Sequence, residues 1–506
     1  MKASLLIAKT AAFCTALMVP LLPYLVNGGP FIGDSWVHMA LAEAIISQGR
    51  YAFQGYNTRW PLVNLLLAQV ALTLRLPLLT ASQAVPLLAG LTSIPLYTYF
   101  RRAGLTVEEA LLAILFFTLL PLYPQVAFLG AVMKETAAFY QLALMLMLSV
   151  TICKRSALKP ALPIFLLVSA GLTLGHHYGG LVAALLLTLL VWHAVLQRLQ
   201  GRIGTVKPLV TLLIIHWSFL TSWNALTVMS IGAFFQALNV NDLALMAATI
   251  TVTTALVAGG SRTSRLAGAS LTLIACLIVV LGLRKGWIYS TLSPAEPFSV
   301  RELLIYAAST LLASYGALKG LRLNAVKALA SATIGLVVYS VLWGFTYPGL
   351  VLLTKAAHYF ALPASIFAGC TLASTLKRKG GRMLIAVLAA FIVYSASLTI
   401  QPALEGLGAY NYGEVTSAAE LSSFMGDAKV VGDTKLNYLM AYFGLNVHHV
   451  TPLKEVGGGS LLALLRSNWL QGFLYGYEWA PAGKLLEQVD RYGRIYDSQH
   501  LKAFLT

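Results

Sequence analysis

The acidic and basic residues that could do chemistry gather in short stretches beside long apolar runs. In the first stretch, Asp34 precedes a segment with helical spacing, Ser35–Ile46, in which His38, Ala42 and Ile45 share one face. Asp34 could serve simply as the N-cap of that helix. A carboxylate at an apolar boundary with an imidazole four residues on exceeds what a cap requires, so we predict a chemical role for Asp34.

Other stretches carry further candidate groups at the ends of apolar runs. Lys134 and Glu135 are adjacent, and a snorkelling lysine paired with the acid would be a simpler explanation for them. His176 and His177 are also adjacent, and they could bind phosphate or a metal. Adjacent residues do not share a helix face, so a metal site using both is not favoured. The remaining candidates are Glu296 in the segment Leu283–Arg301, Lys355 and His358.

The composition restricts the class of protein. Of 506 residues, 58% are apolar and only 10% are charged, whereas soluble domains carry about 25% charged residues. This excludes disorder, a secreted disulfide scaffold and a nucleic-acid-binding protein. The four cysteines form no CxxC pair and sit in or beside apolar runs, as small hydrophobic residues do.

A helix that crosses a bilayer needs about 20 mostly apolar residues, and the sequence holds 13 such runs. The first follows Met1 and Lys2 without a small-residue cleavage site, which is typical of a retained signal-anchor. We therefore predict a polytopic α-helical membrane protein. The runs begin near Ser4, Val85, Glu108, Glu135, Pro160, Tyr178, Pro208, Asp242, Ser264, Glu302, Ala325, Gly349 and Met383.

The apolar stretch Pro61–Leu74 decides the topology. With 14 residues, it is short for a crossing and suits an interfacial helix. If it does not cross, an N-terminus inside the cell leaves 18 Lys and Arg in inner loops and eight in outer loops before residue 401. The positive-inside rule favours this arrangement. We predict an outside C-terminus, a first outer loop at 27–84 with interfacial helices, and a later outer loop at 284–301.

The composition changes after residue 400. Residues 401–506 hold ten acids and eight bases, and short apolar segments alternate with amphipathic ones such as Leu436–Phe443. This alternation predicts a small α/β extracytoplasmic domain, separate from a transmembrane catalytic domain of residues 1–400. A domain of this size is near the lower limit for burying its own core, so we expect it to rest on the membrane part.

The run Asp34–His38, with Ala42, Ile45 and Gly49, resembles the first-loop signature of C-type (GT-C) glycosyltransferases. The order of the spans from Val85 to Ala138 and the segment TKAAHYFALPASIFAG at 354–369 resemble the catalytic subunit of oligosaccharyltransferase, archaeal type. The resemblance implies a GT-C-like fold with 13 spans, an outside C-terminal domain, and sugar transfer from a lipid-linked donor.

The resemblance also implies roles for the candidate residues. Such chemistry needs a carboxylate that activates the acceptor and cations that neutralise the leaving phosphate. Asp34 would be the base or would orient the acceptor. Glu135 would be the second-loop acid, and Glu296 the acid that the family places before a proline between spans 9 and 10. Substrate or phosphate would be held by His38, Lys134, His176, His177, Lys355 and His358.

The second outer loop departs from the family pattern. The family commonly has two acids there, spaced Asp-x-Glu, but the first position is Met133, beside Lys134. A divalent cation, Mn²⁺ or Mg²⁺, held by Asp34 and Glu135 would have fewer oxygen ligands than hard cations prefer. We predict weak or absent metal dependence, with Lys134 neutralising part of the phosphate charge. Alternatively, one of the adjacent histidines replaces the acid, which would favour Mn²⁺ or Zn²⁺.

The C-terminal region departs as well. The family's WWDYG motif, which reads the hydroxyl residue of an Asn-x-Ser/Thr acceptor, is missing from the sequence. The corresponding segment is VVGDTKLNYLMAYFGLNV, with Asp433 and Lys435. Transfer to such a sequon is therefore less well supported than a related GT-C activity.

We predict a multi-pass cell-membrane glycosyltransferase. It would transfer a sugar or oligosaccharide from a polyprenyl-phosphate-linked (dolichyl-type) donor to a protein or lipid acceptor on the outer face. One alternative is a transporter or lipid flippase, for which His216 and His358 are the main midspan titratable groups. Another is a non-catalytic scaffold that displays the C-terminal domain. The concentration of acids in outer loops argues against a transporter.

Overall fold

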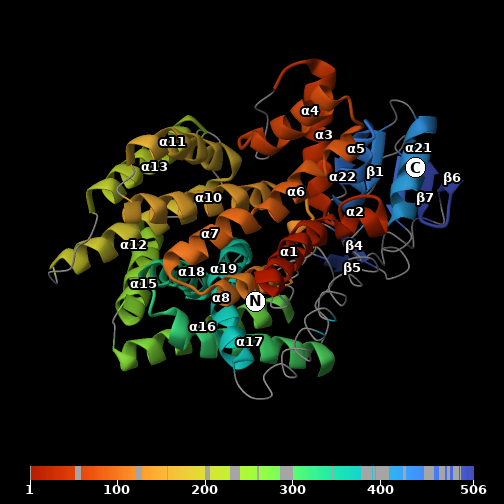
Figure 1. The fold of residues 1–506 in the computed structure, drawn as a ribbon. Helices are drawn as coiled ribbons and strands as arrows, with labels where there is room; N and C mark the ends of the chain where they lie inside the picture. The colour runs from red at the N-terminus through yellow and green to blue at the C-terminus, as the bar shows by residue number, and fades with distance from the viewer. Residues whose placement is uncertain are drawn as a thin grey trace.

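A computed structural model of the chain is mainly α-helical, with a small sheet near the C-terminus (Figure 1). It describes residues 2–51, 58–119, 128–155, 158–199, 206–227, 240–258, 261–284, 300–342, 347–377, 390, 394, 410–425, 429–432, 434–449, 461–465, 473–475, 479–481, 489 and 492–505. The boundary predicted at residue 400 lies outside these residues, as does most of the loop at 284–301.

The helices that precede the sheet follow one another with short connections. They are α1 (Lys2–Met18), the 3₁₀ turn η1 (Val19–Leu21), α2 (Leu22–Asn27), α3 (Gly33–Gln48), α4 (Leu62–Leu74), α5 (Leu78–Ala81), α6 (Ala84–Leu91), α7 (Ser93–Ala103), α8 (Val107–Thr118), α10 (Lys134–Arg155), α11 (Leu158–Gly175), α12 (His177–Leu199), α13 (Val206–Thr227), α15 (Val240–Ala258), α16 (Arg262–Arg284), α17 (Val300–Gly320), α18 (Asn324–Leu342) and α19 (Tyr347–Leu376).

Nine helical segments within the described ranges are long and apolar enough to cross a bilayer. They coincide with nine of the 13 predicted runs, and the chain is therefore a multi-pass membrane protein. The runs predicted near Glu108, Asp242 and Glu302 coincide with α8, α15 and α17. Of the run predicted near Met383, the structure describes only residues 390 and 394.

Helix α4 has the length and surface predicted for Pro61–Leu74. Its 13 residues extend about 20 Å at ~1.5 Å per residue, short of the ~30 Å hydrocarbon core. Val63, Leu67 and Ala71 form a buried stripe against α3 and α5. Leu65 and Leu72 lie on the other side and are 41% and 60% exposed. A helix too short to cross, with one apolar stripe buried and apolar side chains exposed on its other side, is suited to lying at the membrane surface or dipping partway into it.

The centre of the bundle is α19, which packs against α8, α17 and α18. Small residues let these helices approach closely. A Cβ atom at Gly369 of α19 would lie 2.7 Å from the backbone of both Glu109 and Ala113 in α8. Helix α10 packs against α7 and α11 on another side of the bundle. The arrangement fixes the start of α10 and the first half of α19, which carry the site described below.

The C-terminal region has the mixed α/β structure that the sequence predicts. Helix α21 (Tyr412–Met425) leads to β1 (Lys429–Gly432), α22 (Thr434–Tyr442) and β2 (Asn446–His449), followed by β3 (Leu461–Leu465), β6 (Gly493–Asp497) and β7 (Leu501–Leu505). The strand order is β2-β1-β3-β7-β6. Strand β1 is parallel to β2 and β3, and β7 is antiparallel to β3 and β6. Strands β4 (Phe473–Tyr475) and β5 (Trp479–Pro481) form a separate antiparallel pair.

Helices α3–α5 and the C-terminal region share one hydrophobic core. Trp36 and Met39 of α3 join Leu436, Leu439 and Met440 of α22 in a single buried cluster. In Figure 1, α3, α4 and α5 lie beside α22 and the sheet, at one side of the long helices. The C-terminal region therefore packs directly on the helix that carries Asp34.

Candidate active site

Asp34 lies in the first turn of α3 and its residue is exposed. The N-cap is Ile32, in extended conformation, and no side-chain cap bond is formed there, so Asp34 does not cap the helix. The predicted helix over Ser35–Ile46 is confirmed. Ser35 is buried, and its hydroxyl accepts a 2.9 Å hydrogen bond from the backbone N–H of Val132. This bond ties the start of α3 to the turn that leads into α10.

Lys134 and Glu135 begin α10, and each is only 4% exposed. Glu135 forms a partly buried ion pair, from its Oε1 to Nζ of Lys355 in α19. His176 Nε2 also lies 3.3 Å from Glu135 Oε1. These two partners of Glu135 come from segments distant in the sequence, the α11–α12 corner and α19.

His176 is the single residue between α11 and α12. Its N–H bonds Leu172 O at 3.0 Å to end one helix, and its C=O accepts from Gly180 N at 2.9 Å to begin the next. Gly179 N–H donates to His176 Nδ1 at 3.1 Å, so in the neutral ring the proton is on Nε2, toward Glu135. Burial, and then the charge of Lys134, lower the pKa of His176 well below its usual 6.5.

His38 belongs to the same group. It is buried on α3, and its Nδ1 lies 2.8 Å from Oδ1 of Asn64 in α4. Burial lowers the pKa of His38 to about 3, with a further contribution from Lys134. The imidazole is therefore neutral at physiological pH and can donate Nδ1–H to Asn64. Asn64 is a polar residue inside the apolar run Pro61–Leu74, a signal that could have identified it from the sequence.

Trp60 forms a wall of the site that sequence reasoning missed. It is fully buried, and the Lys134 ammonium lies 5.2 Å from its ring centroid, within cation–π range. The ring of His177 packs on Trp60 at 4.4 Å. His177 in turn lies 4.9 Å from His176, ring to ring. The two adjacent histidines thus point to different partners, as the helix geometry predicts.

Aromatic contacts set the position of α19 beside α10. Phe139 and Tyr359 stack at 4.9 Å with their planes 8° apart. Phe128 and His358 stack at 3.8 Å. Tyr359, one turn beyond Lys355, also places its hydroxyl 3.4 Å from His176 Nδ1. These contacts align Lys355 with Glu135. His358 packs against an aromatic ring and is fully buried, so the geometry favours packing over phosphate binding for that residue.

The site brings two lysines to a carboxylate. Asp34 interacts electrostatically with both Lys134 and Lys355. The N-termini of α3, α10 and α12 meet here, since Ser35 bonds Val132 and His176 contacts Glu135. Helix N-termini carry partial positive charge and exposed N–H groups, which favour anions. The arrangement can hold a phosphate beside a carboxylate that is open to an incoming acceptor.

The residues do not suit a divalent cation. The carboxylate of Glu135 already contacts an ammonium and an imidazole N–H, and Lys134 is adjacent. A dication would compete with two ammonium groups for the oxygens of Asp34 and Glu135, whereas hard cations need several free oxygens. Among the residues that the structure describes, no group of three or more His, Cys, Asp or Glu side chains could hold a metal ion.

Glu296 and Asp433, which the sequence singles out, lie outside the described residues.

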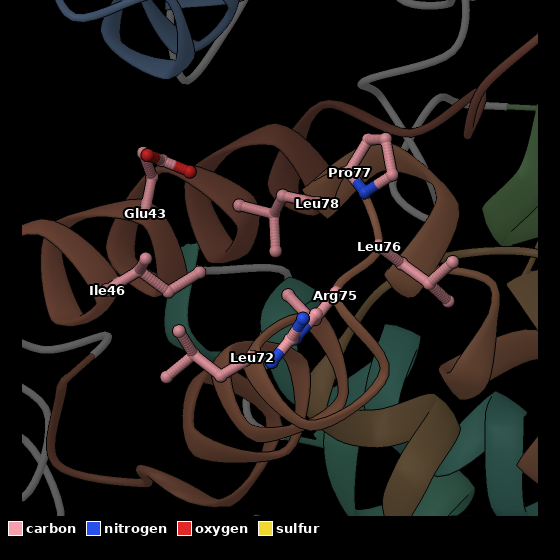
Figure 2. Close-up of a pocket in the computed structure, with 8 residues that line it drawn as sticks. Glu43, Ile46, Leu72, Arg75, Leu76, Pro77 and Leu78 are labelled. Atoms are coloured by element: carbon pink, nitrogen blue, oxygen red, sulfur yellow. The ribbon is translucent and has the colours of Figure 1, made fainter.

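A pocket of about 340 Å³ lies between α3 and the α4–α5 turn, with Glu43 and Arg75 among its lining residues (Figure 2). Glu43 follows Asp34 by nine residues, which at ~100° per residue puts it on the opposite side of α3 and about 13 Å along the helix. The pocket is thus separate from the site.

Comparison with known proteins identifies the fold. No protein-family model and no curated protein matches the sequence. Among solved structures, archaeal oligosaccharyltransferase AglB from Archaeoglobus fulgidus, in complex with an inhibitory peptide and a dolichol-phosphate, matches with a TM-score of 0.58 at 12% identity, over 92% of this chain and 69% of that chain. The apo form of the Archaeoglobus fulgidus oligosaccharyltransferase matches with a TM-score of 0.55 at 13% identity, over 88% and 64%.

ArnT from Cupriavidus metallidurans, bound to undecaprenyl phosphate, is also similar, with a TM-score of 0.43 at 10% identity, over 99% of this chain and 98% of that chain. That score is too low to carry an argument. The oligosaccharyltransferase matches show that the chain shares the fold of these proteins, which confirms the polytopic α-helical fold class expected from the sequence. At this identity they establish the fold alone, and an activity has to be argued from the site.

Proposed function

We propose that this protein is a membrane glycosyltransferase that moves a sugar from a polyprenyl-phosphate-linked donor to a protein or lipid acceptor on the outer face. The observation that carries the proposal is the electrostatic interaction of the exposed Asp34 with Lys134 and Lys355, in a fold similar to that of archaeal oligosaccharyltransferase. A carboxylate beside two partly or fully buried cations is suited to a reaction in which one group loses a proton and another gains negative charge.

The chemistry can be written with these side chains alone. The acceptor's nucleophilic atom bonds to the anomeric carbon of the sugar while the bond from that carbon to the phosphate oxygen breaks. Asp34 takes the proton of the acceptor as general base. The bonding electrons leave with the polyprenyl phosphate, whose added charge is stabilised by Lys134, Lys355 and the N-terminus of α10. Glu135 orients Lys355, and His176 helps to fix Glu135.

The surroundings support a lipid-linked donor. The site lies at the ends of membrane-spanning helices, so a donor's hydrocarbon tail can remain in the bilayer while its phosphate reaches the lysines. The alternative function, a transporter or lipid flippase that uses His216 as a midspan titratable group, receives less support. His216 is fully buried, but Ser169 and the carbonyl of Gly180 occupy its two ring nitrogens, each at 2.9 Å. These bonds join α11, α12 and α13 structurally.

Lipids that remain bound during purification test this function. We expect mass spectrometry of the purified protein to detect a polyprenyl phosphate or its sugar-linked form. The double variant Lys134→Ala/Lys355→Met should lose that lipid, because its two phosphate-binding cations are gone. A matched double variant, Lys207→Ala/Lys319→Met, changes two lysines away from the site and should retain it. Recovery of ordinary membrane phospholipids alone from the wild-type protein would refute the proposal.

A further inference from the structure

The C-terminal region contacts α3 at the turn that carries Asp34. Tyr410 is fully buried and lies against Gly33, the residue before Asp34. A Cβ atom at Gly33 would lie 3.3 Å from the Tyr410 hydroxyl and 3.4 Å from the ring of Tyr438 in α22. The start of α3 therefore rests directly on a tyrosine that is nearly 400 residues away in the chain.

Tyr410 is anchored at both ends. Its backbone carbonyl accepts a hydrogen bond from the side-chain amide of Asn27, which ends α2 just before the segment that leads into α3. Its hydroxyl donates a 2.6 Å bond to the backbone carbonyl of Lys435 in the first turn of α22. Trp36 of α3 packs on the Tyr410 ring with centroids 5.7 Å apart. Tyr410 thus links the end of α2, through its backbone carbonyl, and α3, through its ring, to α22, through its hydroxyl.

A buried ion pair between Lys435 and Glu414 lies beside the Tyr410 ring. Lys435 Nζ lies 3.0 Å from the Glu414 carboxylate, and each side chain is 1% exposed. The same ammonium lies 5.3 Å from the Tyr410 ring centroid. Glu414 also accepts from the backbone N–H of Asn411, whose side chain accepts from Glu414 N–H in return. Buried ion pairs add little net stability, but in some proteins they specify one arrangement of the elements that they join.

A hydrogen bond between Ser35 and Val132 connects the Tyr410–Gly33 contact to the segment that carries Lys134. Asp34 stands between Gly33, which Tyr410 supports, and Ser35, which accepts the Val132 N–H two residues before Lys134. Tyr410 from one side and Val132 from the other therefore define where the Asp34 carboxylate stands relative to Lys134. None of these contacts involves a group that would touch substrate.

We propose that Tyr410, held by the Lys435–Glu414 pair, is a positioning residue for Asp34, so that the C-terminal region completes the active site without contributing a reacting group. This inference rests on the proposed function for the role of Asp34. The geometric part, that Tyr410 sets the location of residue 34 beside the two lysines, stands independently and can be measured without turnover.

The first test is kinetic and uses Tyr410→Phe, which removes only the hydroxyl and its bond to Lys435. We expect kcat to fall by about tenfold, because small displacements of a reacting group reduce the rate strongly. The KM for the lipid-linked donor should not change, since the lysines that hold phosphate remain. Tyr412→Phe is the matched control: Tyr412 is two residues away and 65% exposed. Unchanged kcat in Tyr410→Phe, or an equal loss in Tyr412→Phe, would overturn the proposal.

The second test reports geometry alone. A thiol introduced by Asp34→Cys would lie beside Lys134 and Lys355, whose charges favour the reactive thiolate. Its alkylation by a water-soluble maleimide, corrected for the chain without the new cysteine, should slow at least threefold when Tyr410→Phe is added. It should keep its rate with Tyr412→Phe. Equal alkylation rates for Asp34→Cys with and without Tyr410→Phe would overturn the positioning role of Tyr410. A wild-type protein without transferase activity would reject only the proposed function.

Discussion

Glu135 and Lys355 form an ion pair across 220 residues of sequence, and it joins the start of α10 to α19. Glu135 is 5% and Lys355 18% exposed in their side chains. The pair explains how the protein keeps a second cation near Asp34: the carboxylate holds the Lys355 ammonium in place at a cost in desolvation. We propose that Glu135 orients Lys355 through this pair.

Breaking this ion pair from one side should destabilise the protein. Lys355→Met removes the ammonium paired with the buried Glu135 carboxylate, and we expect the free energy of unfolding to fall by about 3–5 kcal/mol. The double variant Lys355→Met/Glu135→Met removes both charges and should recover most of that loss. Thermal unfolding in detergent micelles measures both.

The Lys319–Glu109 pair provides a control for the same chemistry. It also joins two helices, but Lys319 is 47% exposed in its side chain. Lys319→Met should therefore cost no more than about 1 kcal/mol, as exposed pairs do. Equal losses in Lys355→Met and Lys319→Met would show that the Glu135–Lys355 pair is not effectively buried.

Activity should not depend on a divalent cation. Lys134 and Lys355 supply the positive charge that a metal would otherwise provide, so we expect sugar transfer to continue in EDTA. Lys134→Ala should lower the rate by about 10²-fold, the size of effect seen when a group that stabilises developing charge is removed. Lys207→Ala, an exposed lysine at the start of α13, should leave it unchanged. Loss of activity in EDTA with recovery in Mn²⁺ would reject the metal-free chemistry and leave the glycosyltransferase assignment intact.

Acid should destabilise the fold through His38. Its pKa is about 3 in the folded protein and 6.5 ordinarily, so below pH 6.5 the unfolded state binds a proton that the folded state does not. The free energy of unfolding should then fall by about 1.4 kcal/mol per pH unit between pH 6.5 and 3 from this residue. His38→Gln should reduce the slope of stability against pH by that amount. Identical slopes for variant and wild type between pH 6.5 and 5 would argue against a buried neutral His38.

The predicted topology can be tested by labelling from outside the cell. Ser423→Cys places a thiol at an exposed position of α21, and Arg102→Cys places one near the end of α7, within a basic cluster assigned to the inner side. A membrane-impermeant maleimide applied to intact cells should label the first and not the second. The unsubstituted chain gives the background from its native cysteines. Labelling of position 102, with or without position 423, would contradict the predicted topology and the resemblance on which it rests.

The helices around the site were predictable because their signals are local. The spacing in Ser35–Ile46 predicts α3, and the length of Pro61–Leu74 predicts a helix too short to cross. The resemblance to GT-C enzymes singled out Asp34, Lys134, Glu135, His176 and Lys355, and all five meet in the structure.

The pairings within the site could not be predicted, because they depend on how α10, α19 and the α11–α12 corner pack. Lys134 is next to Glu135 in sequence, yet the carboxylate pairs with Lys355 because Phe139 and Tyr359 align their helices. The stacking of His358 on Phe128 also depends on how these helices pack, and its role in phosphate binding stays a prediction. Nothing in the residues next to Trp60 or Tyr410 in the sequence indicates a role at the site. Each role depends on contacts with segments that are distant in the sequence.

The most direct measurement is the release of polyprenyl phosphate from a sugar-linked donor by the purified protein with an acceptor extract from the same membranes. We expect turnover by the wild type and a loss of about 10²–10⁴-fold in Asp34→Asn, the usual effect of removing a positioned base. Glu43→Gln, an acid on the opposite side of α3, should keep wild-type activity and fold. Near-wild-type turnover in Asp34→Asn, or no turnover by the wild type with any polyprenyl-phosphate-linked sugar, would show that this site does not perform glycosyl transfer.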